Sequence, residues 1–293
     1  MYMDLERLQP KILQEFKQIL QSNRLSHAYL FAGDFASFNM AVLLAQSRFC
    51  QEKKEGLPCG VCRTCRLIAG NDFSDVKVIE PIGQTIKTET VRSLLREFSS
   101  SGFEGKTQVF IIRDADRLHI NAANSLLKFI EEPQSDSYII LLTQDESNIL
   151  PTIRSRTQIF HFPKNTAYLV NQLELKGLLK SQAEILADLA KDPEQADSFG
   201  DNAKLLDLLK ACEHFAAALV KDEDLAFLEI PQLVLLANEK FEQKWVFHML
   251  TYLLSKNYQK KEVLSYLEAV YQARNMWFSN VSFQNALEYM VIK

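Results

Sequence analysis

The chain has 293 residues, 47% of them apolar, and its 33 lysine and arginine residues against 37 aspartate and glutamate residues give a formal charge of −4. This length predicts two or three domains. A protein that binds nucleic acid on its own typically carries an overall excess of positive charge, which this chain lacks. Any contact with DNA would therefore be local or shared with partners. Because we find no signal peptide and no apolar run long enough to span a bilayer, we expect a soluble, cytoplasmic protein with no membrane partner.

The first half of the chain alternates short apolar runs with helical patterns. The runs typical of buried parallel strands are residues 28–32, 76–80, 109–112, 138–142 and 158–162. Helical patterns cover residues 39–49, 88–98 and 121–130, and Glu131-Glu132-Pro133 ends the last of them. This order predicts an α/β domain with a parallel sheet and helices on both faces. Its ligands are expected at the carboxyl ends of the strands, where Gly33 and Asp114 lie.

Strand patterns end after residue 163, and helical patterns follow. Asn165 or Thr166 can cap a helix that Gly177 ends, and Ser181 and Glu184 form a capping box for the next helix. A proline at position 193 precedes a third short helix. We therefore expect a small helical domain at residues 164–203.

From about Lys204 onward nearly every residue fits an amphipathic helix, with an interruption near Ile230 and Pro231. The sequence thus predicts a third, all-α domain. The expected domains are 1–163, 164–203 and 204–293.

The loop after the first strand stands where a phosphate-binding loop would stand but lacks its functional groups. After Gly33, such a loop needs a second glycine, a lysine and a serine or threonine hydroxyl. Phe38, Asn39 and Met40 occupy those positions, so no ammonium meets phosphate and no hydroxyl meets magnesium. Alone, the segment also fits an ordinary strand, turn and amphipathic helix.

Four cysteines follow within sixteen residues: Cys50, Cys59, Cys62 and Cys65, with the spacing C-x8-C-x2-C-x2-C. This pattern is typical of a structural Zn²⁺ site with four thiolate ligands and no open position. The alternative is two disulfides, but an intracellular chain of this length and apolar content needs no covalent staples. A closed site of this kind predicts scaffolding rather than catalysis.

Four motifs occur in a fixed order: residues 26–33 (SHAYLFAG), the four-cysteine insert, residues 121–133 (NAANSLLKFIEEP) and residues 153–157 (IRSRT). Together they resemble the delta-prime subunits of the bacterial DNA polymerase III clamp loader, a family of the AAA+ superfamily. The matching motifs all lie within residues 1–163. Beyond residue 163 the resemblance is limited to the helical architecture. It implies an AAA+ module with a zinc insert, a small helical lid and a C-terminal helical collar. It also implies partners: delta and gamma/tau subunits in a hetero-pentameric ring that places the sliding clamp on primed DNA.

The resemblance also identifies the positions at which active relatives handle ATP. Where an Asp-Glu pair would hold magnesium and polarise water, this chain has Arg113 and Asp114. Asp114 and Asp116 are interpreted as caps of the following turn. Thr143 stands at the sensor-1 position, which reads the γ-phosphate in active relatives. No arginine in residues 157–273 could serve as a second sensor, so we expect no ATP in this chain's own site.

Ser155-Arg156-Thr157 matches the Ser-Arg-Cys motif of the family except at its last residue. The resemblance implies that Arg156 projects across a subunit boundary and meets the γ-phosphate of the neighbour's ATP, with Ser155 beside it. A guanidinium stabilises charge on a transferring phosphoryl group only when the subunits are docked. The alternative is that Arg154 and Arg156 are solvated loop charges.

The sequence therefore predicts a non-hydrolysing clamp-loader subunit that holds one end of the ring as a stator and donates an arginine finger. Two alternatives remain. One is an active ATPase of the gamma/tau type. The other is a zinc-dependent nucleic-acid binder in which Lys53, Lys54, Arg63 and Arg66 contact phosphate.

Overall fold

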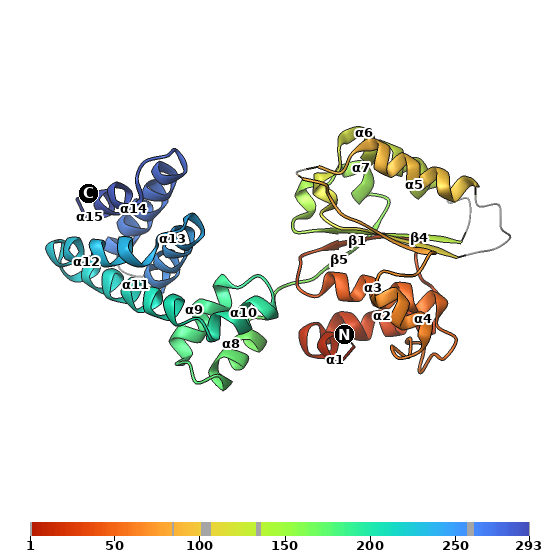
Figure 1. Ribbon diagram of the computed structural model, residues 1–293, viewed down its shortest axis with the longest axis horizontal. Coiled ribbons are helices and arrows are strands. Elements are labelled where there is room, and N and C mark those ends of the chain that lie inside the picture. The colour runs from red at the N-terminus through yellow and green to blue at the C-terminus, as the bar shows by residue number, and fades with distance from the viewer. Residues whose placement is uncertain (1, 84, 101–106, 133–135, 257–260, 293) are drawn as a thin grey trace. The chain divides into compact units, whose positions relative to one another are not determined.

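The computed structural model describes residues 2–83, 85–100, 107–132, 136–256 and 261–292. The chain divides into two compact units, residues 1–165 and 166–293 (Figure 1). The first unit contains the sheet, and the second is helical among its described residues.

The first unit is built on a parallel sheet of five strands: β1 (Ala28–Ala32), β2 (Val76–Ile79), β3 (Gln108–Ile112), β4 (Ser137–Thr143) and β5 (Gln158–His161). Their order across the sheet is β2-β3-β4-β1-β5. The five strands predicted from the sequence are confirmed, with ends that differ by one residue at most. Because all five run parallel, their carboxyl ends share one edge of the sheet, and the candidate site lies there.

Helices cover both faces of this sheet. On one side lie α2 (Pro10–Gln21), α3 (Ser37–Phe49) and α4 (Arg63–Ala69), and on the other α5 (Thr88–Ser100) and α6 (Ile120–Glu131) (Figure 1). Side chains alternate across each strand: Tyr29 and Phe31 pack toward α2 and α3, whereas Ala28 and Leu30 pack toward α5 and α6. The predicted two-sided α/β arrangement is confirmed.

Several short helices of this unit were not predicted from the sequence. They are α1 (Tyr2–Leu8), α2, α4 and α7 (Pro151–Arg154). Pro10 and Pro151 each lie in the first turn of their helix, where a missing N–H costs no hydrogen bond, so both were start signals.

The second unit contains eight helices among its described residues: α8 (Thr166–Leu175), α9 (Lys180–Leu189), α10 (Pro193–Gly200), α11 (Ala203–Lys221), α12 (Glu223–Leu236), α13 (Lys240–Ser255), α14 (Lys261–Phe278) and α15 (Phe283–Ile292). Gly177 follows α8 with φ +93°, which confirms it as the helix stop. Over the described ranges, we find no helix with the length and apolar character needed to cross a membrane.

Two expectations for this unit are wrong. The capping box of Ser181 and Glu184 does not form: the N-cap of α9 is Leu179, two residues before Ser181, and it provides no side-chain cap among the described residues. Glu184 instead pairs with Lys256 at 2.6 Å, because a tertiary ion pair competes for its carboxylate. The chain also does not break near Pro231: α12 continues through it, since the proline ring lies on an exposed face and only one helical N–H is lost.

Candidate functional site

Gly33, directly after β1, joins three strands at the carboxyl edge of the sheet. Its N–H donates to the Thr143 carbonyl of β4 at 2.8 Å. Its φ of +101° and the 2.3 Å that would separate an added Cβ from the Phe162 carbonyl oxygen exclude any side chain here. The glycine of the phosphate-binding-loop position therefore serves close backbone packing.

The loop between β1 and α3 is tied down by a side chain distant in sequence. Gln9, only 5% exposed, donates through Nε2 to the Phe35 carbonyl at 2.9 Å and to the Pro163 carbonyl at 2.7 Å. Phe35 is itself buried. Sequence reasoning missed Gln9, because nothing local to it indicates partners 26 and 154 residues away.

The side chains at the predicted phosphate-loop positions, and Arg113 near them, contact other parts of the protein. Met40 is fully buried in the core, and Asn39 is half-buried. The Arg113 guanidinium lies 4.7 Å from the centroid of the Phe38 ring, and its Nη1 donates to Glu80 Oε1 at 2.6 Å. The structure thus brings Phe38 and Arg113 together as a stacked pair, which the sequence motifs did not predict.

Thr143, at the sensor position, is buried and hydrogen-bonded within the protein. Its hydroxyl lies 3.0 Å from the Asp145 carbonyl and 3.2 Å from Asp116 Oδ1. The interpretation of Asp114 and Asp116 as turn caps is wrong: in the described part of the chain, Asp114 gives the η1 turn (Ala115–Arg117) no side-chain cap. Asp116 accepts from Thr143 because the two strand ends are adjacent in the sheet.

Three carboxylates, those of Asp34, Asp114 and Asp116, bring negative charge to this edge of the sheet. Burial, the largest cause, raises the pKa of Asp34 above its ordinary value, and the negative charges of Asp114 and Asp116 raise it further. A hydrogen bond from Gln144 and the charge of Arg113 act in the opposite direction. A polyphosphate placed here would meet these carboxylates, which is electrostatically unfavourable.

The four predicted metal ligands converge between α3 and α4. The Cys50 Sγ lies 3.6 Å from that of Cys59 and 4.0 Å from that of Cys62, and all four sulfurs, with that of Cys65, lie within 4.8 Å of one another. A tetrahedral ion with Zn–S bonds of about 2.3 Å requires sulfurs about 3.8 Å apart. A disulfide requires about 2 Å, so the spacing fits a metal and not a bond.

Backbone N–H groups of the insert point at the sulfurs. The N–H groups of Cys59, Cys62 and Cys65 donate to sulfurs at 3.3–3.5 Å. Hydrogen bonds from the backbone of Val61 and Cys62 lower the pKa of Cys59 to about 7, whereas burial raises that of Cys50 and of Cys65. Such N–H groups stabilise thiolate charge, which a zinc site requires.

The insert is anchored on two helices of the sheet unit. Gln46 of α3 donates to the Cys65 carbonyl at 2.8 Å, in a buried position. On α2, Gln21 donates to the Glu55 carbonyl at 2.9 Å, and Lys17 forms an ion pair with the Glu55 carboxylate. These contacts therefore attach the cysteine cluster to the helices that cover the sheet.

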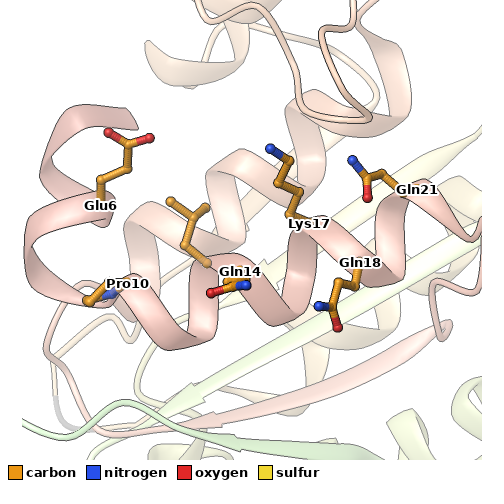
Figure 2. Close-up of a pocket in the computed structure, with 7 residues that line it drawn as sticks. Glu6, Pro10, Gln14, Lys17, Gln18 and Gln21 are labelled. Carbon is orange, nitrogen blue, oxygen red and sulfur yellow. The ribbon is translucent and has the colours of Figure 1, made fainter.

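Two further cavities lie away from the sheet edge. One, of about 580 Å³, runs along α1 and α2 beside the insert and contains no nucleophile next to a base (Figure 2); it is lined by Glu6, Pro10, Leu13, Gln14, Lys17, Gln18 and Gln21. The other, of about 330 Å³, is lined by Arg63, Arg66, Leu67, Gly70 and Asp72 of the insert. Asp72 opposes phosphate there, so Arg63 and Arg66 form no purely cationic surface, and Lys53 and Lys54 are flanked in sequence by Glu52 and Glu55.

Arg156 follows the short helix α7 and is partly exposed. Its Nε donates to Glu131 Oε1 at 2.5 Å, and its Nη1 donates to the Thr152 carbonyl at 3.0 Å and to Ser155 Oγ at 3.3 Å. The side chains of Arg156 and Glu131 are 41% and 47% exposed. The structure therefore presents the guanidinium at the surface with a carboxylate partner, Glu131, that sequence reasoning missed.

The parallel sheet, the loop after β1 and the cysteine insert between α3 and α4 define an AAA+ module. Residues 8–166, more than half of the chain, match the protein family described as "DNA polymerase III, delta subunit". The chain is also 29% identical to DNA polymerase III subunit delta' of Bacillus subtilis, over 99% of this chain and 97% of that protein. The chain belongs to the delta-prime family of DNA polymerase III clamp-loader subunits.

Other similar proteins match about half of the chain, or resemble it in fold. DNA polymerase III subunit tau of Salmonella typhimurium is 34% identical over 52% of this chain, which corresponds to 24% of that protein. A DNA polymerase III gamma subunit-related protein from Thermotoga maritima superposes with a TM-score of 0.50 at 19% identity, covering 96% of this chain and 97% of that one. This second likeness shows the fold alone.

Proposed function

We propose that this chain is a non-hydrolysing stator subunit of a cytoplasmic clamp loader, with no ATP in its own site. Its partners are delta and gamma/tau subunits in a hetero-pentameric ring that places the sliding clamp on primed DNA. Residues 1–163 form the AAA+ domain, residues 164–203 the lid and residues 204–293 the collar through which the subunits associate.

One observation carries the stator assignment: Arg113, at the position where active relatives would carry the magnesium-binding aspartate, is stacked on Phe38 and paired with Glu80. A cation there repels Mg²⁺, and the phenyl ring fills the space in which a glycine would let the backbone wrap phosphate. The buried side chain of Met40 supplies no hydroxyl for the metal. An active ATPase of the gamma/tau type needs a magnesium-binding carboxylate, a glycine that lets the backbone wrap phosphate, and a hydroxyl for the metal. This chain has Arg113, Phe38 and Met40 at those positions, which opposes that alternative.

The exposure and contacts of Arg156 support its proposed role as an arginine finger. It is exposed, and its ion pair with Glu131 is of the surface type, which is worth about 0–1 kcal/mol. Docking of a neighbouring subunit could therefore redirect the guanidinium from Glu131 to a phosphate at small cost. Ser155, whose Oγ lies 3.3 Å from Nη1, contributes to positioning the arginine.

The cysteine cluster supports a structural Zn²⁺ ion. Its sulfur spacing matches a tetrahedral site, and four protein ligands leave no position for substrate. When bound, zinc would cross-link the ends of α3 and α4. The nucleic-acid-binding alternative lacks support, because Asp72 lies among the arginines of the insert.

Titration of the isolated chain with magnesium-ATP in a calorimeter tests the stator assignment, with a gamma/tau subunit from the same cell as positive control. We expect no saturable binding by this chain at ATP concentrations that saturate the control. A micromolar dissociation constant for this chain would overturn the proposal.

A further inference from the structure

Helix α12 presents an apolar face to the surface of the second unit. Leu228 and Leu235 are 74% and 73% exposed, and Leu225 is 44% exposed. Pro231 lies between them on the same side and is also exposed. The spacing of three, three and four residues places all four side chains along one stripe of a helix, which we name the α12 face.

Among the described residues of the unit, the α12 face remains largely exposed. The opposite side of the helix is buried, with Ala226, Ile230 and Leu233 no more than 2% exposed. That buried side packs against α11, which runs beside α12, and against α15 (Figure 1). An exposed stripe of large apolar side chains beyond a complete core is typical of a protein interaction surface.

The segment that contains the α12 face carries only negative charges between its two ends. Residues 222–239 contain five acidic residues, Asp222, Glu223, Asp224, Glu229 and Glu239, and no lysine or arginine. Lys221 and Lys240 border this segment at its two ends. The apolar stripe is therefore flanked by negative charge, which selects a partner with positive charge at the matching positions.

We propose that the α12 face binds an amphipathic helix of another clamp-loader subunit, one whose apolar stripe is bordered by lysine or arginine. This inference rests on the proposed function, in which the chain associates with other subunits through its helical domain. It adds the surface that makes the contact and the chemistry of the partner that fits it.

A second copy of this chain does not fit the α12 face. Two parallel copies of α12 would set Asp222 and Asp224 against the same residues. Two antiparallel copies would set them against Glu239 and the C-terminal end of the helix, which carries partial negative charge. Both arrangements bring like charges together, so the surface disfavours self-association and favours a different subunit.

The experiment is assembly of the full-length chain with purified delta and gamma/tau subunits, followed by sedimentation velocity. We compare the wild-type chain with the double variant Leu228→Ser/Leu235→Ser. The matched control is Leu264→Ser, which changes a leucine that is 58% exposed on α14. Far-UV circular dichroism checks that each variant is folded, as expected for changes at exposed positions.

We expect the double variant to bind its partner subunits about 10- to 100-fold more weakly, because central apolar anchors dominate interface affinity. Leu264→Ser should assemble like the wild type. A second variant, Asp224→Lys/Glu229→Lys, should also weaken assembly and should reduce its dependence on salt concentration.

The outcomes separate this inference from the function on which it rests. If the wild-type chain assembles and the leucine variant assembles equally well, the inference is overturned and the proposed function stands. If the isolated wild-type chain forms a dimer that the leucine variant abolishes, the surface is a self-contact and the inference is overturned. If the wild-type chain joins no ring, both are overturned.

Discussion

Removal of two zinc ligands should weaken the whole sheet unit while leaving it folded. In Cys62→Ala/Cys65→Ala, only Cys50 and Cys59 remain of the four sulfurs that lie within 4.8 Å of one another. Two thiolates cannot complete a tetrahedral site, so zinc should be lost. Because binding energy at a structural zinc site is folding energy, the insert should loosen.

The size of the effect follows from what the insert buries. Leu57 and Ile68, in and beside the insert, are 5% and 3% exposed and belong to the core between the sheet and α2 and α3. If the loosened insert exposes both side chains to water, each exposure lowers the free energy of unfolding by about 1.5–3 kcal/mol. Losing the buried Gln46–Cys65 hydrogen bond costs about 1 kcal/mol more. A loss of roughly 4–7 kcal/mol is a large part of a typical stability of about 5–15 kcal/mol.

The assay combines zinc analysis with urea unfolding. We expect one zinc per wild-type chain and none in the double variant, with Cys212→Ala, which changes a buried cysteine of α11, as the control that retains zinc. Both tryptophans, Trp245 and Trp277, lie in the second unit, so their fluorescence should report an unchanged transition there. Hydrogen exchange in the sheet strands should show the loss. Full zinc retention, or unaltered exchange in a zinc-free variant, would refute the reasoning.

Two further predictions concern single residues. Asn39→Lys should not restore ATP binding, because one charge-assisted contact of about 1.5–3 kcal/mol falls short of the roughly 4 kcal/mol that a millimolar dissociation constant requires. Micromolar binding in calorimetry would contradict this. Burial raises the pKa of Glu242, but hydrogen bonds from Lys204 and the Glu239 backbone hold that pKa below its usual 4.5. The ionised Glu242 therefore stabilises the folded second unit above pH 4.5, and this stabilisation is lost as the pH falls through the pKa of Glu242 in the folded protein. Glu242→Gln should therefore destabilise the second unit by about 1.5–3 kcal/mol near neutral pH and make its stability depend less on pH below 4.5. Urea unfolding followed by tryptophan fluorescence measures both effects. The same dependence of stability on pH in the variant and the wild type would contradict this prediction.

The sequence predicted the features that depend on local pattern. The five strands are short apolar runs, because a parallel sheet covered on both faces requires apolar residues on both sides of each strand. The cysteine spacing predicted the cluster because ligand geometry constrains ligand separation along the chain. Gly177 was predicted as a helix stop because a positive φ favours glycine.

The features that were missed depend on contacts between distant segments. Phe38 lies in the first turn of α3 and Arg113 directly follows β3, and only the folded arrangement places the guanidinium over the ring. The capping motif beginning at Ser181 failed because its second member finds a partner on another helix. Pro231 was read as a break, although a proline on an exposed face of a supported helix is tolerated.

The central claim is that a chain without ATP of its own contributes Arg156 to hydrolysis by its neighbour. Arg156→Ala removes an exposed ion pair worth at most about 1 kcal/mol, so folding and ring assembly should be nearly unchanged. An arginine finger is worth on the order of 10³ in rate at a single site. A ring with other intact sites should lose less in total.

The direct measurement is DNA-stimulated steady-state ATP hydrolysis by rings rebuilt with wild-type chain, Arg156→Ala or Arg156→Lys. Arg24→Ala, which removes an exposed arginine that precedes β1 at the same amino edge of the sheet as Arg156, is the matched control, and gel filtration confirms that each ring is intact. We predict that Arg156→Ala lowers hydrolysis, that Arg156→Lys recovers part of it because an ammonium lacks the planar fork, and that Arg24→Ala matches the wild type. Unaltered hydrolysis in an intact Arg156→Ala ring would contradict the account.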